Sequence, residues 1–318
     1  MRKALVVGID YYKKVSHLNG CVNDANSIRE VLERNGDGTK NFDVLCLTAT
    51  SPTDVVSKRT LKDSITALFK DNNDEIALLY FSGHGYLDET GGYLVTSDAE
   101  SGDDGLAMSD ILTIANKSPS NNKIIILDCC HSGQAGNSID LGNVATLTEG
   151  TTILTASGPE QYSIEEDNNG VFTTLFVDAM NGAAANLVGD ITPGSVYAHI
   201  DQSLGPWDQR PVFKTNIKRF ISLRKVEPPI TIQELKQIVV LFPISGEEYA
   251  LDPEYEPDSQ NPVQEKMDKF AILQKFNRVY LVVPVGEMHM YYAAMNSKSC
   301  KLTDLGKHYW RLVNKGRI

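Results

Sequence analysis

The sequence is short of the features that mark several protein classes. Its 318 residues include only five cysteines, at positions 21, 46, 129, 130 and 300, so no disulfide framework is indicated and a reducing, cytoplasmic location is expected. Hydrophobic runs stay well below the roughly 20 residues that span a bilayer, so no membrane association is expected. The apolar stretch Ala4–Ile9 lacks a small-residue cleavage site and predicts a strand rather than a signal peptide.

Basic residues are also scarce. The chain has 30 Lys and Arg against 41 Asp and Glu, a formal net charge of -11. Not one Lys or Arg occurs between Ile124 and Gln209. Because contacts to phosphates need clustered Lys and Arg, this composition argues against a nucleic-acid partner and favours basic partners instead.

Residues 1–224 alternate apolar runs with amphipathic segments, which is typical of a mostly parallel sheet flanked by helices, an α/β fold. Strands are expected at Lys3–Ile9, Phe42–Leu47, Glu75–Phe81, Lys123–Leu127 and Thr151–Ala156. Helices are expected at Asn23–Asn35, Ser57–Lys70, Ser109–Asn116 and Phe172–Asn181. The glycine-rich stretch Tyr86–Thr96 predicts a hairpin or lid, and a short strand is expected around Arg210–Phe213.

The composition changes at residues 225–229, where two adjacent prolines follow charged residues and predict a linker. Residues 230–318 are then expected to form a small α+β or winged-helix-like module. Its expected elements are a loop at Glu248–Gln264, helices at Val263–Phe276 and Leu302–Asn314, and a strand at Arg278–Val285. The acidic loop and the modest number of basic residues favour a protein-interaction or sensing module over a nucleic-acid-binding wing.

Two motifs with reactive side chains follow predicted strands. The first is Tyr-Phe-Ser-Gly-His-Gly at residues 80–85, and the second is Leu-Asp-Cys-Cys-His-Ser-Gly at residues 127–133. Because functional groups in open α/β sheets gather beyond the carboxyl ends of the strands, both motifs should reach one crevice. A thiol needs a neighbouring imidazole to take its proton, which makes His84 the expected base. The backbone N–H groups of Gly85 and Cys130 are the expected oxyanion donors.

Each motif alone also has other interpretations. Ser-Gly-His-Gly could be a turn whose histidine caps a helix. The paired cysteines could be small buried hydrophobes or, with His131, metal ligands. Zinc sites usually have four ligands with recurrent spacing, and the sequence has no second Cys-x-x-Cys or His-x-His pair, so no metal site is expected.

Taken together, the two motifs resemble those of the caspase superfamily of cysteine peptidases, and most closely those of metacaspases and their bacterial relatives. Residues 8–11, 18–25, 155–157 and 170–173 extend this resemblance over about the first two hundred residues. The resemblance implies a caspase-like fold, with Cys130 rather than Cys129 as the nucleophile and His84 as its partner. It leaves the C-terminal module unexplained.

The resemblance also implies an acidic S1 pocket, the subsite for the residue before the cleaved bond. The matching positions are Cys21, Asp24, Ser82 and Asp128. Two carboxylates in one pocket need a cation from the substrate, so Arg or Lys is expected at P1. Asp24 could instead cap a helix. Because the superfamily includes both, a preference for an acidic residue or Asn at P1 also stays open.

Calcium is a cofactor of many metacaspases, so the resemblance raises the question of a calcium site. Asp98 and Asp110 lie near plausible positions, and Asp103 and Asp104 could contribute, but Ser109 and Asn137 interrupt the expected carboxylate pattern. No cofactor is therefore expected to be required.

Activation by self-cleavage after the nucleophile is not expected, because the segment 134–150 lacks the Lys or Arg at which such an enzyme would cut. Arg224 and Lys225, beside the linker, are the candidate sites further on. Activation by a partner or sensor through the C-terminal module is expected instead, an arrangement similar to that of bacterial defence effectors. The alternative is a catalytically silent scaffold that acts through that module.

Overall fold

The computed structural model describes residues 1–70, 74–129, 146–157, 165–166, 169–204 and 210–318. They form two compact units. The N-terminal unit comprises residues 1–186 and 190–226, and the C-terminal unit comprises residues 187–189 and 227–318.

The core of the N-terminal unit is a six-stranded sheet in the order β12-β8-β7-β3-β1-β2. Its strands are β1 (Arg2–Ile9), β2 (Asp43–Ala49), β3 (Ile76–Ser82), β7 (Asn122–Asp128), β8 (Thr151–Thr155) and β12 (Val212–Asn216). β12 pairs antiparallel with β8, whereas all other neighbours pair in parallel. The predicted mostly parallel sheet is therefore confirmed, and the predicted strand ends lie within three residues of these.

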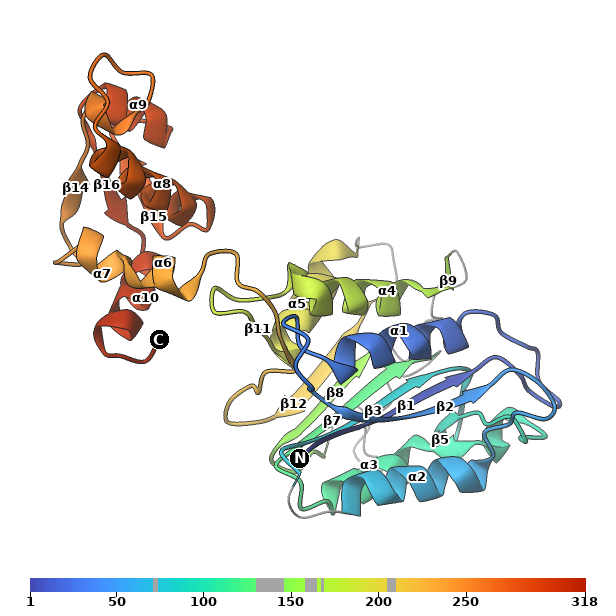
Figure 1. Cartoon of the computed structure of the whole chain (residues 1–318). Helices are drawn as coiled ribbons and strands as arrows, with labels where there is room; N and C mark the ends of the chain where they lie inside the picture. Colours follow the sequence, from blue (N-terminus) through green and yellow to red (C-terminus); the bar gives the residue numbers. More distant parts are fainter. Residues whose placement is uncertain (71–73, 130–145, 158–164, 167–168, 205–209) are drawn as a thin grey trace. The chain divides into compact units, whose positions relative to one another are not determined.

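Helices cover both faces of this sheet, as Figure 1 shows. They are α1 (Cys21–Glu33), α2 (Lys58–Lys70), α3 (Met108–Asn116), α4 (Val171–Asp178), which continues into the π-helical η3 (Ala179–Ala183), and α5 (Pro193–Ser203). Alternate residues of β1 face opposite ways: Leu5 and Val7 join the core beneath α2 and α3, while Ala4 and Val6 join the core beneath α1, α4 and α5. The result is a three-layer α/β/α arrangement.

The close approach of α1 to β1 depends on a glycine. A Cβ atom at Gly8 would lie 2.3 Å from the carbonyl oxygen of Cys21 and 2.7 Å from the Cβ atom of Ala25. The side chain of Asp10, just after β1, accepts a hydrogen bond of 2.9 Å from the N–H of Cys21. This bond satisfies one of the backbone donors that a helix start leaves unpaired, so β1 fixes both the distance and the start of α1.

The predicted hairpin after the third strand is present. It consists of β4 (Gly85–Asp88) and β5 (Gly91–Leu94), and β5 also pairs with β6 (Leu106–Ala107) after the short helix η1 (Gly102–Asp104). Two small antiparallel pairs complete the unit: β9 (Glu165–Glu166) with β10 (Asn169–Gly170), and β11 (Asp190–Ile191) with β13 (Arg224–Lys225). The first residue of the predicted linker, Lys225, thus pairs with Asp190.

The C-terminal unit has α+β structure with its own hydrophobic core, which includes Leu235, Leu273 and Phe276. Its sheet has the order β14-β16-β15, formed by β14 (Glu248–Ala250), β15 (Val282–Val285) and β16 (Ser299–Leu302). Its helices are α6 (Ile232–Lys236), α7 (Ile238–Leu241), η4 (Pro253–Tyr255), α8 (Gln264–Arg278), α9 (Met290–Met295) and α10 (Asp304–Asn314).

Two sequence predictions for this unit were wrong in part. The predicted loop Glu248–Gln264 begins with strand β14, because Tyr249 and its neighbours pair with β16. The predicted strand Arg278–Val285 starts only at Val282, because α8 continues to Arg278 and Tyr280 adopts a positive φ of 59°, which is outside the range of a β-strand.

Within the described residues, no helix combines the length and apolar character needed to cross a membrane.

Candidate active site

His84 lies between the end of β3 and the start of β4 and is partly buried. Its Nε2 atom lies 2.8 Å from the backbone carbonyl oxygen of Ser16, in the loop that follows β1. A carbonyl oxygen only accepts hydrogen bonds, so Nε2 carries a hydrogen, and the lone pair of the neutral ring is then on Nδ1. The imidazole is therefore in the tautomer that can accept a proton at Nδ1. The turn interpretation, with His84 as a helix cap, does not fit this position between two strands.

The paired cysteines follow β7, the neighbour of β3 in the sheet. The side chain of Cys129 is only 1% exposed and packs in the core beneath α2 and α3. Such a thiol is not accessible to a substrate, which favours the next cysteine as a nucleophile. Cys130 and His131 themselves lie outside the described residues, so the contact between the sulfur of Cys130 and His84 is not tested, nor is a metal role of this pair.

The predicted acidic residues are brought together from two elements. Asp24 lies in the first turn of α1 and Asp128 ends β7, and both are almost completely buried, at 2% and 5% exposure. Ser82, the last residue of β3, donates a hydrogen bond of 3.0 Å to Oδ2 of Asp24. Asp24 is not the helix cap, since the N-cap residue of α1 is Gly20. Its side chain points into the protein toward β3.

The segment that begins α4 completes this cluster, and sequence reasoning did not assign it a role. The N–H of Gly170 donates to Oδ1 of Asp24 at 3.1 Å, and the hydroxyl of Thr173 donates to Oδ2 of Asp128 at 2.6 Å. A Cβ atom at Gly170 would lie 2.5 Å from Oδ2 of Asp128 and 3.1 Å from Oδ2 of Asp24. Both carboxylates therefore converge on the same point of the chain, which only glycine can occupy. We name Asp24, Ser82, Asp128, Gly170 and Thr173 the acidic cluster.

The remaining two predicted site residues lie beside these groups. Cys21 is the first residue of α1, and burial raises the pKa of its thiol far above its usual range, so the thiol stays neutral. Gly85 is the first residue of β4 and pairs with Leu94. Its position directly after His84 is where an oxyanion donor was predicted, but the substrate geometry that would test this role involves Cys130.

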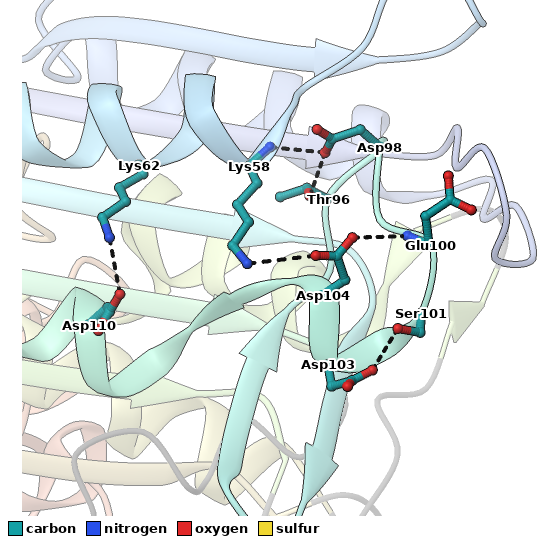
Figure 2. A network of polar contacts seen from close by, with 9 residues as sticks. All are labelled: Lys58, Lys62, Thr96, Asp98, Glu100, Ser101, Asp103, Asp104 and Asp110. Atoms are coloured by element: carbon teal, nitrogen blue, oxygen red, sulfur yellow. Dashed lines mark hydrogen bonds and ion pairs between the residues drawn. The ribbon is translucent and has the colours of Figure 1, made fainter.

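The carboxylates near the plausible calcium positions form a different network, shown in Figure 2. The ammonium group of Lys62 lies 3.2 Å from Oδ2 of Asp110, and that of Lys58 lies 3.8 Å from Oδ1 of Asp104. Oδ1 of Asp98 accepts hydrogen bonds from the N–H of Lys58 and from Thr96.

These carboxylates do not fit a calcium site, because calcium needs six or more converging oxygen ligands, whereas Asp104 and Asp110 pair with two different lysines. In the ranges that the structure describes, no group of three or more His, Cys, Asp or Glu side chains is arranged to hold a metal ion.

The chain is similar to several known proteins. The sequence model of the family described as "Caspase domain" matches residues 1–221. The chain is 26% identical to Metacaspase-6 of Arabidopsis thaliana over 246 residues, which cover 70% of this chain and 62% of that protein. It is 29% identical to Metacaspase-1 of Plasmodium falciparum over 153 residues, covering 44% of this chain and 25% of that protein. The matches thus span less than two thirds of the length of these relatives.

Two solved structures share the fold. Caspase-1 from Spodoptera frugiperda superimposes with a TM-score of 0.51 at 15% identity, covering 71% of this chain and 91% of that chain. A protein from Geobacter sulfurreducens superimposes with a TM-score of 0.53 at 18% identity, covering 71% of this chain and all of that chain. At these identities the likeness concerns the fold alone.

Proposed function

Because this chain belongs to the caspase domain family, we propose that it is a cysteine endopeptidase that cleaves proteins after Arg or Lys with a dyad of His84 and Cys130. One observation carries the proposal: the ends of β3 and β7 and the first turn of α1 bring an imidazole with an available Nδ1 and two buried carboxyl groups to one edge of the sheet. A thiol nucleophile needs such an imidazole to take its proton, and a basic P1 side chain needs such carboxyl groups to bind it.

The proposed reaction follows from the tautomer of His84. Nδ1 takes the proton of the Cys130 thiol as the sulfur bonds to the scissile carbonyl carbon, and the imidazolium then protonates the leaving amine as the C–N bond breaks. Water next attacks the thioester, which releases the new carboxyl terminus and returns the thiol. The carbonyl of Ser16 bonds to Nε2 throughout, so it stabilises the imidazolium when the ring is charged.

The preference for Arg or Lys rests on the buried charge of the acidic cluster. Ser82, Gly170 and Thr173 donate hydrogen bonds to the two carboxyl groups from uncharged groups, so these three donors bring no positive charge to the cluster. A guanidinium or ammonium group from a substrate would be attracted to both carboxyl groups. The N-terminal unit as a whole also favours a basic substrate, since it contains 19 Lys and Arg against 29 Asp and Glu.

Peptide substrates test the proposal directly. Fluorogenic peptides that differ only at P1, with Arg, Lys, Asn or Asp, should give kcat/KM values for Arg and Lys at least about 100-fold above those for Asn and Asp, because only a cation is attracted to both carboxyl groups. Cleavage after Asp or Asn alone would refute the basic pocket. The absence of cleavage with every peptide under every activating condition would favour the catalytically silent scaffold.

Activation by a partner rather than by self-cleavage is part of the proposal. The guanidinium of Arg224 donates to the carbonyl oxygens of Arg34 and Met180, both at 2.9 Å, and its backbone pairs with β11. A protease needs several residues of extended, accessible chain, so cleavage after Arg224 or Lys225 would require local unfolding first. We therefore favour noncovalent activation through the C-terminal unit, as in a defence or signalling effector of the reducing cytoplasm.

Calcium removal should leave the activity unchanged. Lys58 and Lys62 already balance the carboxylates of Asp104 and Asp110, so no calcium is needed to do so. Excess EGTA is expected to change kcat/KM for an Arg peptide by less than about twofold, the size of a weak exposed charge effect. Loss of activity in EGTA that added calcium restores would contradict this. Added magnesium serves as the control for a general effect of divalent ions.

A further inference from the structure

We propose that Tyr12 is a positioning residue for the dyad, which holds the backbone of His84 through its phenol oxygen and the imidazole through its ring. The inference rests on the proposed function. It concerns a residue outside both sequence motifs, in the loop between β1 and α1. The same loop supplies the Ser16 carbonyl that bonds to Nε2 of His84, so the base would be held from one loop at two places.

Tyr12 is itself held firmly. Its side chain is 1% exposed, and the residues on both sides are fixed by backbone hydrogen bonds, from Tyr11 to the carbonyl of Ala49 at 3.0 Å and from Lys13 to the carbonyl of Ser97 at 2.9 Å. The carbonyl of Tyr12 accepts a third bond, of 3.0 Å, from the ring of His17. A side chain anchored in this way can position its neighbour, because its own freedom has been lost on folding.

The contacts of Tyr12 with His84 involve two different parts of the histidine. The backbone N–H of His84 donates a hydrogen bond of 2.8 Å to the phenol oxygen. The two rings lie against each other with centroids 4.7 Å apart at an angle of 49°. Burial raises the pKa of Tyr12 well above its usual range, so the phenol oxygen is a neutral acceptor throughout the working pH range.

The glycine of the Ser-Gly-His-Gly motif matches this role. A Cβ atom at Gly83 would lie 2.7 Å from the phenol oxygen of Tyr12, so a larger residue there would displace the phenol from His84. The N–H of Gly83 also lies 3.4 Å from the carbonyl oxygen of Asp128, the residue before the paired cysteines. On the other side of His84, its carbonyl oxygen accepts a hydrogen bond of 3.0 Å from the N–H of Val95.

The peptide groups around His84 are thus fixed on both sides, and their orientation sets where the imidazole points. The N–H of Gly85, which we propose as an oxyanion donor, belongs to the next peptide group. Loss of the phenol oxygen would release the N–H of His84. The imidazole of His84 and the N–H of Gly85 could then turn away from the reacting carbonyl. Small misplacements of this kind slow the chemical step without weakening substrate binding.

Kinetics of Tyr12→Phe, normalised to the number of working sites, test the inference. The working sites are counted by labelling to completion with a peptidyl fluoromethyl ketone that carries Arg at P1. In Tyr12→Phe we expect kcat per labelled site to fall about tenfold with KM within about twofold of the wild type. Tyr12→Leu, which also removes the ring, should lower kcat per site further. Tyr11→Phe, the same change at the neighbouring residue, is the matched control and should stay within about twofold.

The outcomes separate this inference from the function on which it rests. Wild-type protein that neither cleaves an Arg peptide nor takes up the label under any activating condition would refute the proposed function. Active wild type with an unchanged kcat per site in Tyr12→Phe would refute the role of Tyr12 alone. A purely structural role of Tyr12 would give that second result, because it would lower the number of labelled sites but not the rate at each.

Discussion

Replacement of Cys130 by Ala is expected to lower kcat/KM for an Arg peptide by about 10⁴-fold or more, because no other group can form the acyl-enzyme. Cys129→Ala is the matched control. Its thiol is buried in the core beneath α2 and α3, so its loss should reduce stability slightly and activity by less than about tenfold. The measurement is kcat/KM for each variant with the same peptide, alongside thermal unfolding.

The partner of the nucleophile should behave in the same way. His84→Ala is expected to lose about as much activity as Cys130→Ala, and the double variant should be no worse than either, because the two side chains act as a unit. If Cys129→Ala abolished cleavage while Cys130→Ala retained it, the assignment of the nucleophile would be wrong. Additive losses in the double variant would show that His84 acts independently of the thiol.

The second large effect is expected at the acidic cluster. Asp24→Asn and Asp128→Asn should each lower kcat/KM for Arg and Lys peptides by about 100-fold, the cost of removing one partner from a desolvated charge pair. Peptides with an uncharged P1 residue should lose far less.

Asp110→Asn is the control for this experiment. It changes the net charge of the protein equally, but its carboxylate is exposed on α3 and pairs with Lys62. Its kcat/KM for Arg peptides should stay within about twofold of the wild type. Equal losses for charged and uncharged P1 residues in Asp24→Asn would mean that Asp24 serves the structure alone.

Much of the sheet could be predicted from the sequence because its strands are continuous apolar runs. Each residue of β3 is buried, so the run from Ile76 to Phe81 stands out from its surroundings. The strands of the C-terminal unit are different. β16 has four residues and alternates buried Cys300 and Leu302 with the more exposed Ser299 and Lys301, and β14 has three residues beside an acidic stretch. Pairing with other strands decides their structure, and no local pattern reports it.

The acidic cluster shows the same limit. Asp24 and Asp128 were found through a family resemblance, whereas Gly170 and Thr173 lay in a segment that the resemblance covered without assigning a role. These residues come from elements far apart in the chain, and their types are common ones. Ser16 contributes through its backbone carbonyl, which every amino acid has, so the residue type at this position could not indicate the contact in the sequence. Such contacts become visible only when the topology brings β1, β3, β7 and α4 together.

The spacing between β1 and α1 bears on the proposed selectivity. Residue 8 has a hydrogen atom where any other amino acid would press a carbon against the first turn of α1. Displacing that helix would withdraw the carboxylate of Asp24 from Ser82 and Gly170 together, and so disrupt the proposed site for a cationic side chain. In the proposed peptidase, the preference at P1 would therefore depend on a residue that does not contact the substrate.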